Sequence, residues 1–176
     1  NLSWDLFLAY TPFPDEAELL KKKGQESANG PAVVGRAKAM SMLVNFTGVD
    51  AALLSGGPRP AAQGMLQGTS DGGFVWAAAV QAPEAGAIRL HLTGLNLPPD
   101  VDLFVFSTDG QAFGPYTGRG PNRDGELWTN TVFGPEAVLL ARHYGPDGAK
   151  DLKHLSFAVA DLGHIGRINK EFHNLF

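Results

Sequence analysis

The fold of this chain is decided by one stretch in which apolar and polar residues alternate, Ile88-Arg89-Leu90-His91-Leu92-Thr93. Alternation with a period of two is typical of a β-strand that buries one face and exposes the other. Apolar residues recur at the same spacing a little earlier in the chain, at Phe74, Trp76, Ala78 and Val80. Each stretch therefore predicts a strand that contributes one face to an apolar core.

Further strands are expected before and after these two. Apolar segments of strand length occupy residues 40–46, 101–106, 128–133, 138–143 and 155–159. Segment 101–106 is apolar on both faces except at Asp102, so we expect it in the interior of a sheet. The chain has 22 glycines and 12 prolines, and turn-forming residues separate most of these segments. Short strands without long helices between them predict a mainly β fold, an antiparallel β-sandwich resembling a jelly roll.

Three regions are expected along the chain. Residues 1–72 are predicted to form an N-terminal arm, a short helix over 14–23 and connecting loops, all packed on the sandwich. Residues 55–73, at the end of this region, are rich in glycine and proline and predict a long surface connection that reaches the first residue of the next region. Residues 73–163 are predicted to form the β-sandwich core. Residues 164–176 have apolar residues at helical spacing and predict a tail leading toward a downstream domain.

Composition excludes several classes of function. The net charge of −4 argues against a nucleic-acid partner, because phosphate binding needs a basic face. No apolar run approaches the roughly 18 residues of a membrane-spanning helix. The absence of cysteine excludes a disulfide framework, thiolate catalysis and metal sites built on cysteine.

Residues with a catalytic pattern are not recognisable in this sequence. None of its serines lies in a G-x-S-x-G or a Gly-Asp-Ser-Gly context. The five histidines form no H-E-x-x-H motif or close pair, and His91 is expected to be a solvent-facing strand residue. We therefore expect this chain to have no catalytic residue and no cofactor of its own.

Calcium is the one ion for which the sequence offers candidate ligands. Asp100, Asp102 and Asp109 flank the segment 101–106, and Ca²⁺ prefers several oxygens gathered from loops. Solvated aspartates in turns are the commoner explanation of the same pattern.

Aromatic side chains matter because an exposed ring on a sandwich domain can stack on a sugar. Trp76 and Trp128 lie within strand-like alternation, so core packing is favoured for both. Tyr116 lies in a loop rich in glycine and proline and is the best candidate for exposure.

Two neighbouring segments carry a resemblance to a known family. The segment FGPYTGRGP at 113–121 is followed by GELWTNTVFG at 125–134, and DLFVF at 102–106 precedes both. This order resembles the N-terminal, non-catalytic β domain of secreted bacterial trypsin-like (lysyl-endopeptidase-like) serine proteases. The segment 102–110 also resembles bacterial pre-peptidase C-terminal domains. The resemblance implies a secreted or periplasmic location and a protease domain elsewhere in the same polypeptide, and it assigns no catalytic residue to this chain.

Two functions are expected from these features. The leading one is a non-catalytic accessory domain or pro-domain of a secreted serine endopeptidase, which acts by surface contact in folding, inhibition or targeting. Its partner would be the adjacent protease domain, and its binding loop would comprise Phe113, Tyr116, Arg119 and Trp128. The alternative is a stand-alone module that binds a carbohydrate or another cell-surface ligand.

Overall fold

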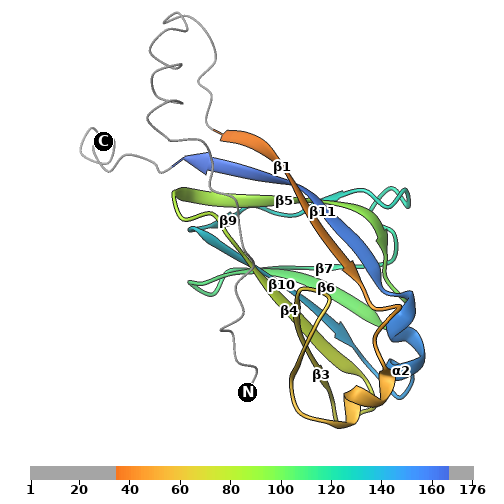
Figure 1. Cartoon of the computed structure of the whole chain (residues 1–176). Helices are drawn as coiled ribbons and strands as arrows, with labels where there is room; N and C mark the ends of the chain where they lie inside the picture. The colour runs from red at the N-terminus through yellow and green to blue at the C-terminus, as the bar shows by residue number, and fades with distance from the viewer. Residues whose placement is uncertain (1–34, 167–176) are drawn as a thin grey trace, which may run out of the picture.

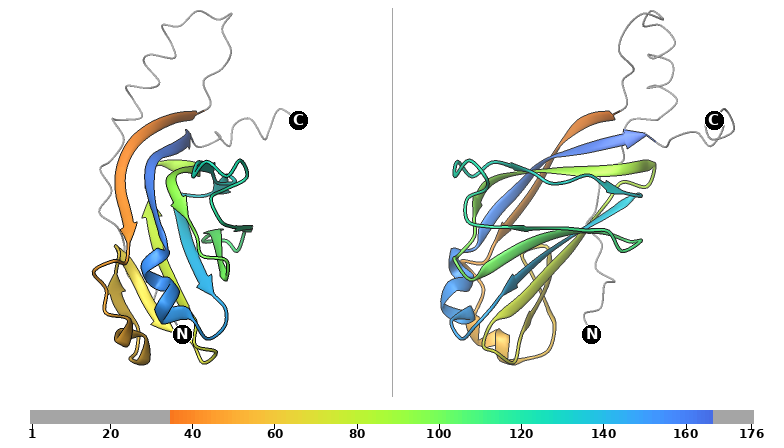
Figure 2. Two further views of the ribbon diagram at one scale, coloured as in Figure 1. Left: turned by 90° about the vertical axis from the view of Figure 1, so that its right-hand side faces the viewer. Right: turned by 180° about the vertical axis from the view of Figure 1, so that it is seen from behind.

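The computed structural model describes residues 35–166, which form two antiparallel β-sheets that lie against one another as two layers (Figures 1 and 2). The predicted mainly β fold, an antiparallel β-sandwich, is therefore confirmed. The helix expected over 14–23 and most of the expected tail lie outside the described residues. None of the helices within residues 35–166 is long and apolar enough to cross a membrane.

One layer, here called the β5 sheet, has β5 at its centre. Its strand order is β1-β11-β5-β8, and β9 also pairs with β5. The strands are β1 Gly35–Asn45, β11 Ser156–Gly166, β5 Ala85–Asn96, β8 Leu127–Trp128 and β9 Val132–Phe133. Along β5, Ile88, Leu90 and Leu92 are buried while Arg89 is exposed, which confirms the alternation predicted for this strand.

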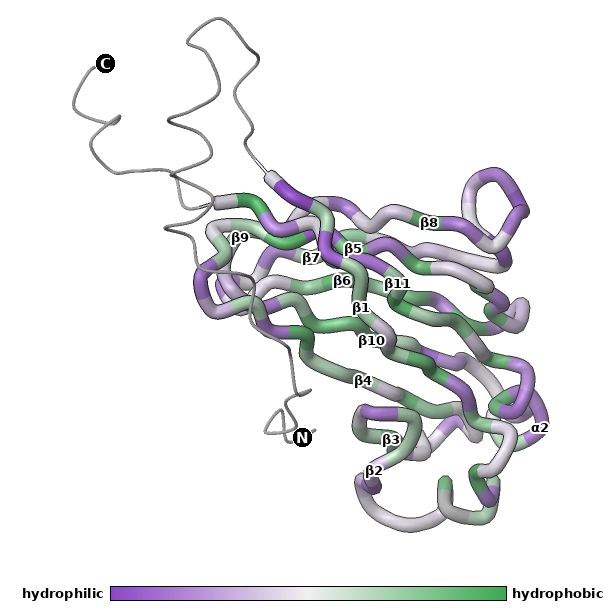
Figure 3. Tube along the Cα trace, turned by 45° about the horizontal axis from the view of Figure 1, so that its top comes forward, coloured by the Kyte–Doolittle hydropathy of each residue, from purple (hydrophilic) through white to green (hydrophobic). Residues whose placement is uncertain are grey.

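The other layer, here called the β10 sheet, has the strand order β2-β3-β4-β10-β6-β7. The strands are β2 Arg59–Ala61, β3 Gly64–Gly68, β4 Phe74–Gln81, β10 Glu136–His143, β6 Val101–Ser107 and β7 Ala112–Tyr116. β6 lies between β10 and β7, as its apolar sequence predicted. Figure 3 shows β4, β6 and β10 coloured mostly as hydrophobic, because these strands carry apolar residues on both faces.

The core lies between the two sheets and is centred on Trp76. Its indole packs edge-on against Phe46 and Phe157, at ring-centroid distances of 6.1 and 5.9 Å. The indole N–H donates a hydrogen bond to the backbone carbonyl of Ala61 at 2.9 Å, so its polar atom is satisfied. Burying a large apolar side chain contributes about 1.5–3 kcal/mol to folding, which makes this cluster a main source of stability.

The region before residue 73 contributes strands to both sheets. β1 supplies the buried Met42 and Val44 to the core, so the sandwich includes at least residues 35–72 as well as the predicted 73–163. Residues 55–73, expected to be a surface connection, contain the hairpin β2–β3. Its two-residue turn has positive φ at Ala62 (48°) and Gln63 (64°). Such turns usually contain asparagine or glycine, which explains why the sequence did not reveal the hairpin.

The connection from β10 to β11 contains two short helices. These are α2 Gly148–Asp151 and the 3-10 helix η2 Leu152–His154. They lie at the same end of the sandwich as the 3-10 helix η1 Ala51–Ser55 (Figure 1). β11 itself runs to Gly166, so the first three residues of the predicted tail belong to a strand.

Candidate functional site

A row of side chains crosses the outer face of the β5 sheet. The register places Ala39 of β1 beside Asp161 of β11, Asp161 beside His91 of β5, and His91 beside Trp128 of β8. These positions point away from the core because their sequence neighbours, such as Leu90, Leu92 and Leu127, point into it. The fold thus gathers three chemically active side chains from three strands on one outer face.

His91 contacts a carboxylate with each of its ring nitrogens. Its Nδ1 lies 2.8 Å from Asp161 Oδ2, and its Nε2 lies 2.5 Å from Glu126 Oε2. The imidazole also stacks on Trp128, with ring centroids 4.7 Å apart and planes inclined by 7°. A neutral imidazole has a single N–H, whereas both partners here are acceptors. The arrangement is therefore that of the protonated, positively charged ring.

The electrostatics of His91 agree with this geometry. Partial burial lowers the pKa of His91, but the hydrogen bonds from its ring to Asp161 and Glu126, together with their negative charges, raise it further. The net result is a pKa above the ordinary value of 6.5.

Trp128 remains 38% exposed on this face. The guanidinium of Arg89 lies over its ring, 5.3 Å from the centroid, and Arg89 Nε donates a hydrogen bond to the Thr129 carbonyl at 3.0 Å. The predicted core packing of Trp128 is therefore wrong. In the two-residue strand β8, Leu127 takes the inward position and Trp128 the outward one. We call Arg89, His91, Glu126, Trp128 and Asp161 together the Trp128 surface.

The predicted binding loop is only partly brought to this surface. Tyr116 is half-buried; its hydroxyl donates to Asn130 Oδ1 at 2.7 Å and accepts a hydrogen bond from the Asn130 backbone N–H at 2.8 Å. Burial raises the pKa of Tyr116, and the hydrogen bond from the Asn130 backbone lowers it by less, so the pKa of Tyr116 lies above its ordinary value. Phe113 packs against the core, and Arg119 is exposed in the loop that follows β7. Tyr116 of β7 is therefore hydrogen-bonded to the connection between β8 and β9, two residues after Trp128, and is less exposed than expected.

The loop of residues 117–126 positions Glu126. Two backbone hydrogen bonds fasten it to the end of β5 and the residue after it, Leu97 N–H to Gly118 O and Leu95 N–H to Gly125 O, both 2.9 Å. Gly120 has a φ of 86°, and a Cβ there would lie 2.8 Å from the Glu126 carbonyl oxygen. Glycine is required at this position because only glycine fits both the backbone conformation and the space.

The three aspartates predicted to bind calcium do not form one group. Asp100 precedes β6 and Asp109 follows it, so the seven residues of this strand separate them by roughly 20 Å. Asp102 lies on the strand beside Arg142 of β10, and Asp109 accepts a hydrogen bond from the Ser107 hydroxyl. The three aspartates are close in the sequence, but β6 is extended and keeps Asp100 and Asp109 at its opposite ends.

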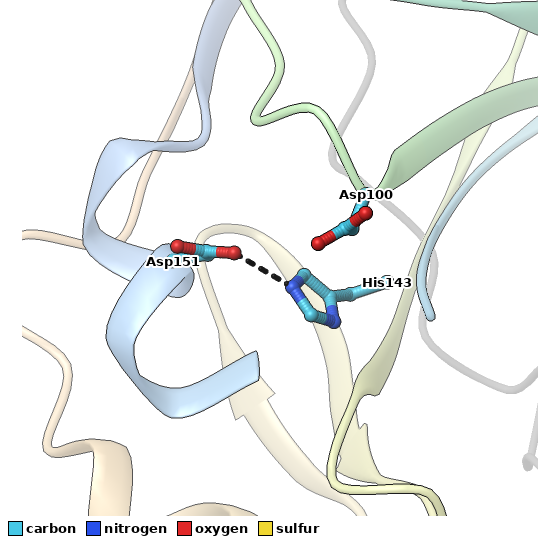
Figure 4. Close-up of side chains that lie close together, drawn as sticks. All are labelled: Asp100, His143 and Asp151. Atoms are coloured by element: carbon cyan, nitrogen blue, oxygen red, sulfur yellow. Dashed lines mark hydrogen bonds and ion pairs between the residues drawn. The ribbon is translucent and has the colours of Figure 1, made fainter. Parts of the chain in front are cut away.

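Asp100 lies instead beside His143 and Asp151 (Figure 4). One oxygen of each carboxylate and one nitrogen of His143 lie within 4.8 Å of one another. His143 is fully buried at the end of β10, and its Nε2 lies 2.9 Å from Asp151 Oδ2 of α2. Packing also holds His143 in place, because its imidazole stacks on Phe74 with ring centroids 5.2 Å apart.

The donor set of this cluster fits a hydrogen-bonded pair better than a metal centre. In the neutral imidazole, Nε2–H donates to Asp151, and Nδ1 is then an acceptor that receives no hydrogen bond within the described residues. A metal on Nε2 would move the proton to Nδ1, which has no hydrogen-bond acceptor in the described part of the chain. His143 and Asp151 are therefore suited to holding α2 against the end of β10.

Neither His91 nor His143 contacts a serine hydroxyl, since the hydrogen-bonding partners of both imidazoles are carboxylates. The sequence pointed to a solvent-facing His91, and the structure places it on the outer face of its strand. The sequence did not reveal that Asp161 and Glu126 contact His91. Their positions 70 and 35 residues away in the chain become neighbours only through the strand register.

Comparison of the chain with protein-family models, with curated proteins and with solved structures finds no match. The kinship with protease-associated β domains is thus a prediction that depends on the sequence resemblance alone.

Proposed function

We propose that this chain is a non-catalytic binding domain that holds a glycan on the Trp128 surface. The observation that carries the proposal is the exposed indole of Trp128, fixed in place on a sheet face by His91 and accompanied by side chains that donate and accept hydrogen bonds. Because His91 stacks on the indole and the Arg89 guanidinium also lies over it, the exposed edge of the ring is the apolar surface offered to the C–H groups of a sugar, and neighbouring polar groups bind the hydroxyls of the sugar.

The charges on this surface favour a neutral, hydroxyl-rich ligand. Arg89 and protonated His91 carry two positive charges, and Glu126 and Asp161 carry two negative charges. A strongly charged ligand would meet as much repulsion as attraction there. A sugar hydroxyl can donate to the carboxylates and accept from Arg89, so it suits both kinds of group.

The shape of the neighbouring strands also supports an extended ligand. Beside Asp161 and Arg89, the outward positions on β11 and β1 are Gly163, Ala37 and Ala39. Ala37 and Ala39 are exposed and leave a low part of the sheet beside the Trp128 surface, whereas the Trp128 indole lies over Gly163, where a Cβ would be 3.6 Å from its Cζ3. A glycan chain lying across the strands would therefore contact Trp128 on one side and the low part of the sheet on the other.

The proposal is tested by calorimetric titration with cellohexaose, xylohexaose, mannohexaose and chitohexaose. At least one is expected to bind, and Trp128→Ala is expected to weaken that binding by tenfold or more, because loss of an aromatic contact typically costs over 1 kcal/mol. Tyr144→Ala is a matched control, since Tyr144 is also exposed (47%) and also has an arginine, Arg142, over its ring at 4.6 Å. Binding that Trp128→Ala and Tyr144→Ala affect equally would contradict the proposal.

A second candidate function is the accessory role beside a protease domain, and the outer face of the β10 sheet favours it. Phe104 and Phe106 of β6 lie on that face, next to Leu140 and Val138 of β10 in the strand register. All four side chains are half-buried, and together they form a contiguous apolar area. Areas of this kind mark contacts with other proteins. A neighbouring domain of the same polypeptide, as the sequence resemblance implies, would cover it.

This second candidate is tested by mixing the domain with the protease domain of its own polypeptide. Inhibition or assisted refolding of the protease is expected, and Phe104→Ser with Phe106→Ser is expected to abolish it. Trp128→Ser, on the opposite sheet, is the control that leaves the effect unchanged. Absence of inhibition and of refolding assistance by the wild-type domain would eliminate this candidate.

A further inference from the structure

Two hydrogen-bond acceptors face the ring of His91, but the neutral ring has only one N–H to donate. Asp161 lies at hydrogen-bond distance from Nδ1 and Glu126 from Nε2, and both are carboxylates. When the ring loses its proton, one nitrogen becomes an acceptor and faces a carboxylate oxygen without a hydrogen between them. One of the two contacts must then open.

We propose that His91 is a pH-operated clasp, which in its protonated form holds the loop of residues 117–126 on the β5 sheet through Glu126 and in its neutral form releases it. The clasp is a property of the unliganded domain. Only its effect on ligand binding rests on the proposed function.

The contact that opens is the one with Glu126. Asp161 belongs to β11, which pairs with β1 on one side and with β5 on the other, and its side chain is 33% exposed. Glu126 precedes a strand of only two residues, and its side chain is 51% exposed. Moving Glu126 into water disturbs less structure than moving Asp161, so Nδ1–H keeps its bond to Asp161 and Nε2 loses its partner.

Opening of the clasp also affects Trp128. In the closed form, the indole stacks on a cation, an arrangement that strengthens the attraction between the two rings. In the open form, that charge and the adjacent charge-assisted hydrogen bond are both lost. The loop keeps its backbone hydrogen bonds to Leu95 and Leu97, so it loosens at its Glu126 end while the rest stays in place.

The charged groups around His91 come from each element that packs against it. β5 supplies Arg89, two residues away on the same face, which opposes a positive charge on the ring. β11 supplies Asp161 and the loop supplies Glu126, which favour that charge, while Asp124 binds the backbone N–H of Glu126 at 2.9 Å. β8 contributes the uncharged Trp128, and beyond Asp161 the register position on β1 is the uncharged Ala39. The two contacting carboxylates therefore favour the protonated ring of His91 more than the single guanidinium disfavours it.

The sign of the pH dependence follows from these groups. The pKa of His91 lies above its ordinary value of 6.5, so the clasp is closed at acidic pH and opens as the pH rises through the raised pKa of the folded state. The Trp128 surface is therefore preorganised in acid and looser in alkali.

The test is an NMR titration of the whole chain from pH 5 to pH 9. The His91 ring signal, assigned by its loss in His91→Gln, is expected to titrate with a pKa above 6.5. The Trp128 indole N–H and the Glu126 backbone amide are expected to shift with the same midpoint. In Glu126→Gln, the His91 pKa is expected to fall, because the negative charge is gone. The pH-dependent shift of the residue 126 backbone amide is expected to vanish in this variant. A glutamine side chain can donate a hydrogen bond to the neutral ring and accept one from the protonated ring, so the contact persists at every pH.

Asp151→Asn provides the matched control, because Asp151 is the carboxylate partner of the other histidine, His143. It is expected to leave the titration of His91 and Trp128 unchanged. A His91 pKa at or below 6.5 would overturn the proposal, and so would a Trp128 signal that does not follow His91. A pH-dependent shift of the residue 126 backbone amide that persists in Glu126→Gln would overturn the proposal as well.

The same titration separates the clasp from the proposed function. If the clasp opens as described and none of the hexasaccharides binds at any pH, the glycan proposal fails and the clasp stands. If a hexasaccharide binds with an affinity that is constant across the His91 midpoint while the clasp opens, the link between clasp and binding is refuted and the glycan proposal stands.

Discussion

The imidazole of His91 and the indole of Trp128 lie parallel, 4.7 Å apart, on the outer face of a five-stranded sheet. Each ring comes from a different strand, and the loop of residues 117–126, which precedes β8, carries Glu126, whose carboxylate contacts Nε2 of the imidazole. This pair combines an exposed apolar surface with a titratable group. The proposed binding and the proposed pH response are therefore both located on the same face of the domain.

Stability should depend on pH through His91. Because its pKa is raised in the folded state, the stabilisation is fully present below the unfolded pKa of about 6.5 and is lost as the pH rises through the folded value. Urea unfolding at pH 5.5 and pH 8.5 should show a difference of a few tenths to about 1 kcal/mol, as for partly exposed ion pairs. His91→Gln should remove this difference, and an unchanged pH dependence in that variant would contradict the assignment.

The opposite dependence is expected at Asp71. Hydrogen bonds from the Thr69 hydroxyl and the Gly145 and Gly73 backbone amides, with a smaller effect of Arg142, hold the pKa of this carboxyl far below its usual range. The resulting stabilisation is present above the unfolded pKa of about 3.9 and is lost as the pH falls below it. Asp71→Asn should lower the urea midpoint at pH 7 and have less effect at pH 3. An equal loss at both pH values would show that the charge is unimportant.

The two tryptophans of the described region should respond differently to truncation. Trp76 is fully buried between the sheets, so Trp76→Ala should lower the free energy of unfolding by about 3–5 kcal/mol. Trp128 is 38% exposed, and Trp128→Ala should cost no more than about 1 kcal/mol. Chemical denaturation of both variants measures the contrast. A large loss of stability in Trp128→Ala would mean that this ring is structural and would weaken its assignment to binding.

The cluster of Asp100, His143 and Asp151 should act as a structural lock. Asp151→Ala leaves the buried His143 N–H without its acceptor and should cost about 1–3 kcal/mol, whereas Asp151→Asn keeps an acceptor and should cost less. Thermal unfolding of the wild type should be the same with Ca²⁺, with Zn²⁺ and with a chelator. A midpoint that rises with either ion, and no longer rises in Asp100→Ala, would show that the cluster binds metal.

The sequence predicted much of the sandwich because burial imposes a period of two on the residues of a strand. Phe74, Trp76 and Val80 are buried on β4, and Ile88, Leu90 and Leu92 on β5, as their alternation indicated. The β2–β3 hairpin was missed because its turn is formed by Ala62 and Gln63, neither of which is a usual residue for positive φ. Local pattern therefore predicts strands well where turn chemistry is conventional.

The candidate site was harder to predict because it depends on register. Trp128 was expected in the core, yet a strand of two residues gives too little alternation to tell its faces apart. Asp161 meets His91 only because β11 pairs with β5 in one particular register. A shift of one residue would have turned Asp161 to the other face of the sheet. The sequence supplies the residues, and the tertiary pairing determines which of them meet.

Glycan binding on the Trp128 surface is tested most directly by a map of backbone and indole NMR shifts on addition of the hexasaccharide that binds most tightly in the calorimetric panel. Binding on this surface predicts that the largest shifts occur at Trp128, His91 and Arg89 and at the neighbouring positions of β11, with little change on the β10 sheet. Shifts centred on the β10 sheet, or no shifts with any of the four hexasaccharides, would contradict it.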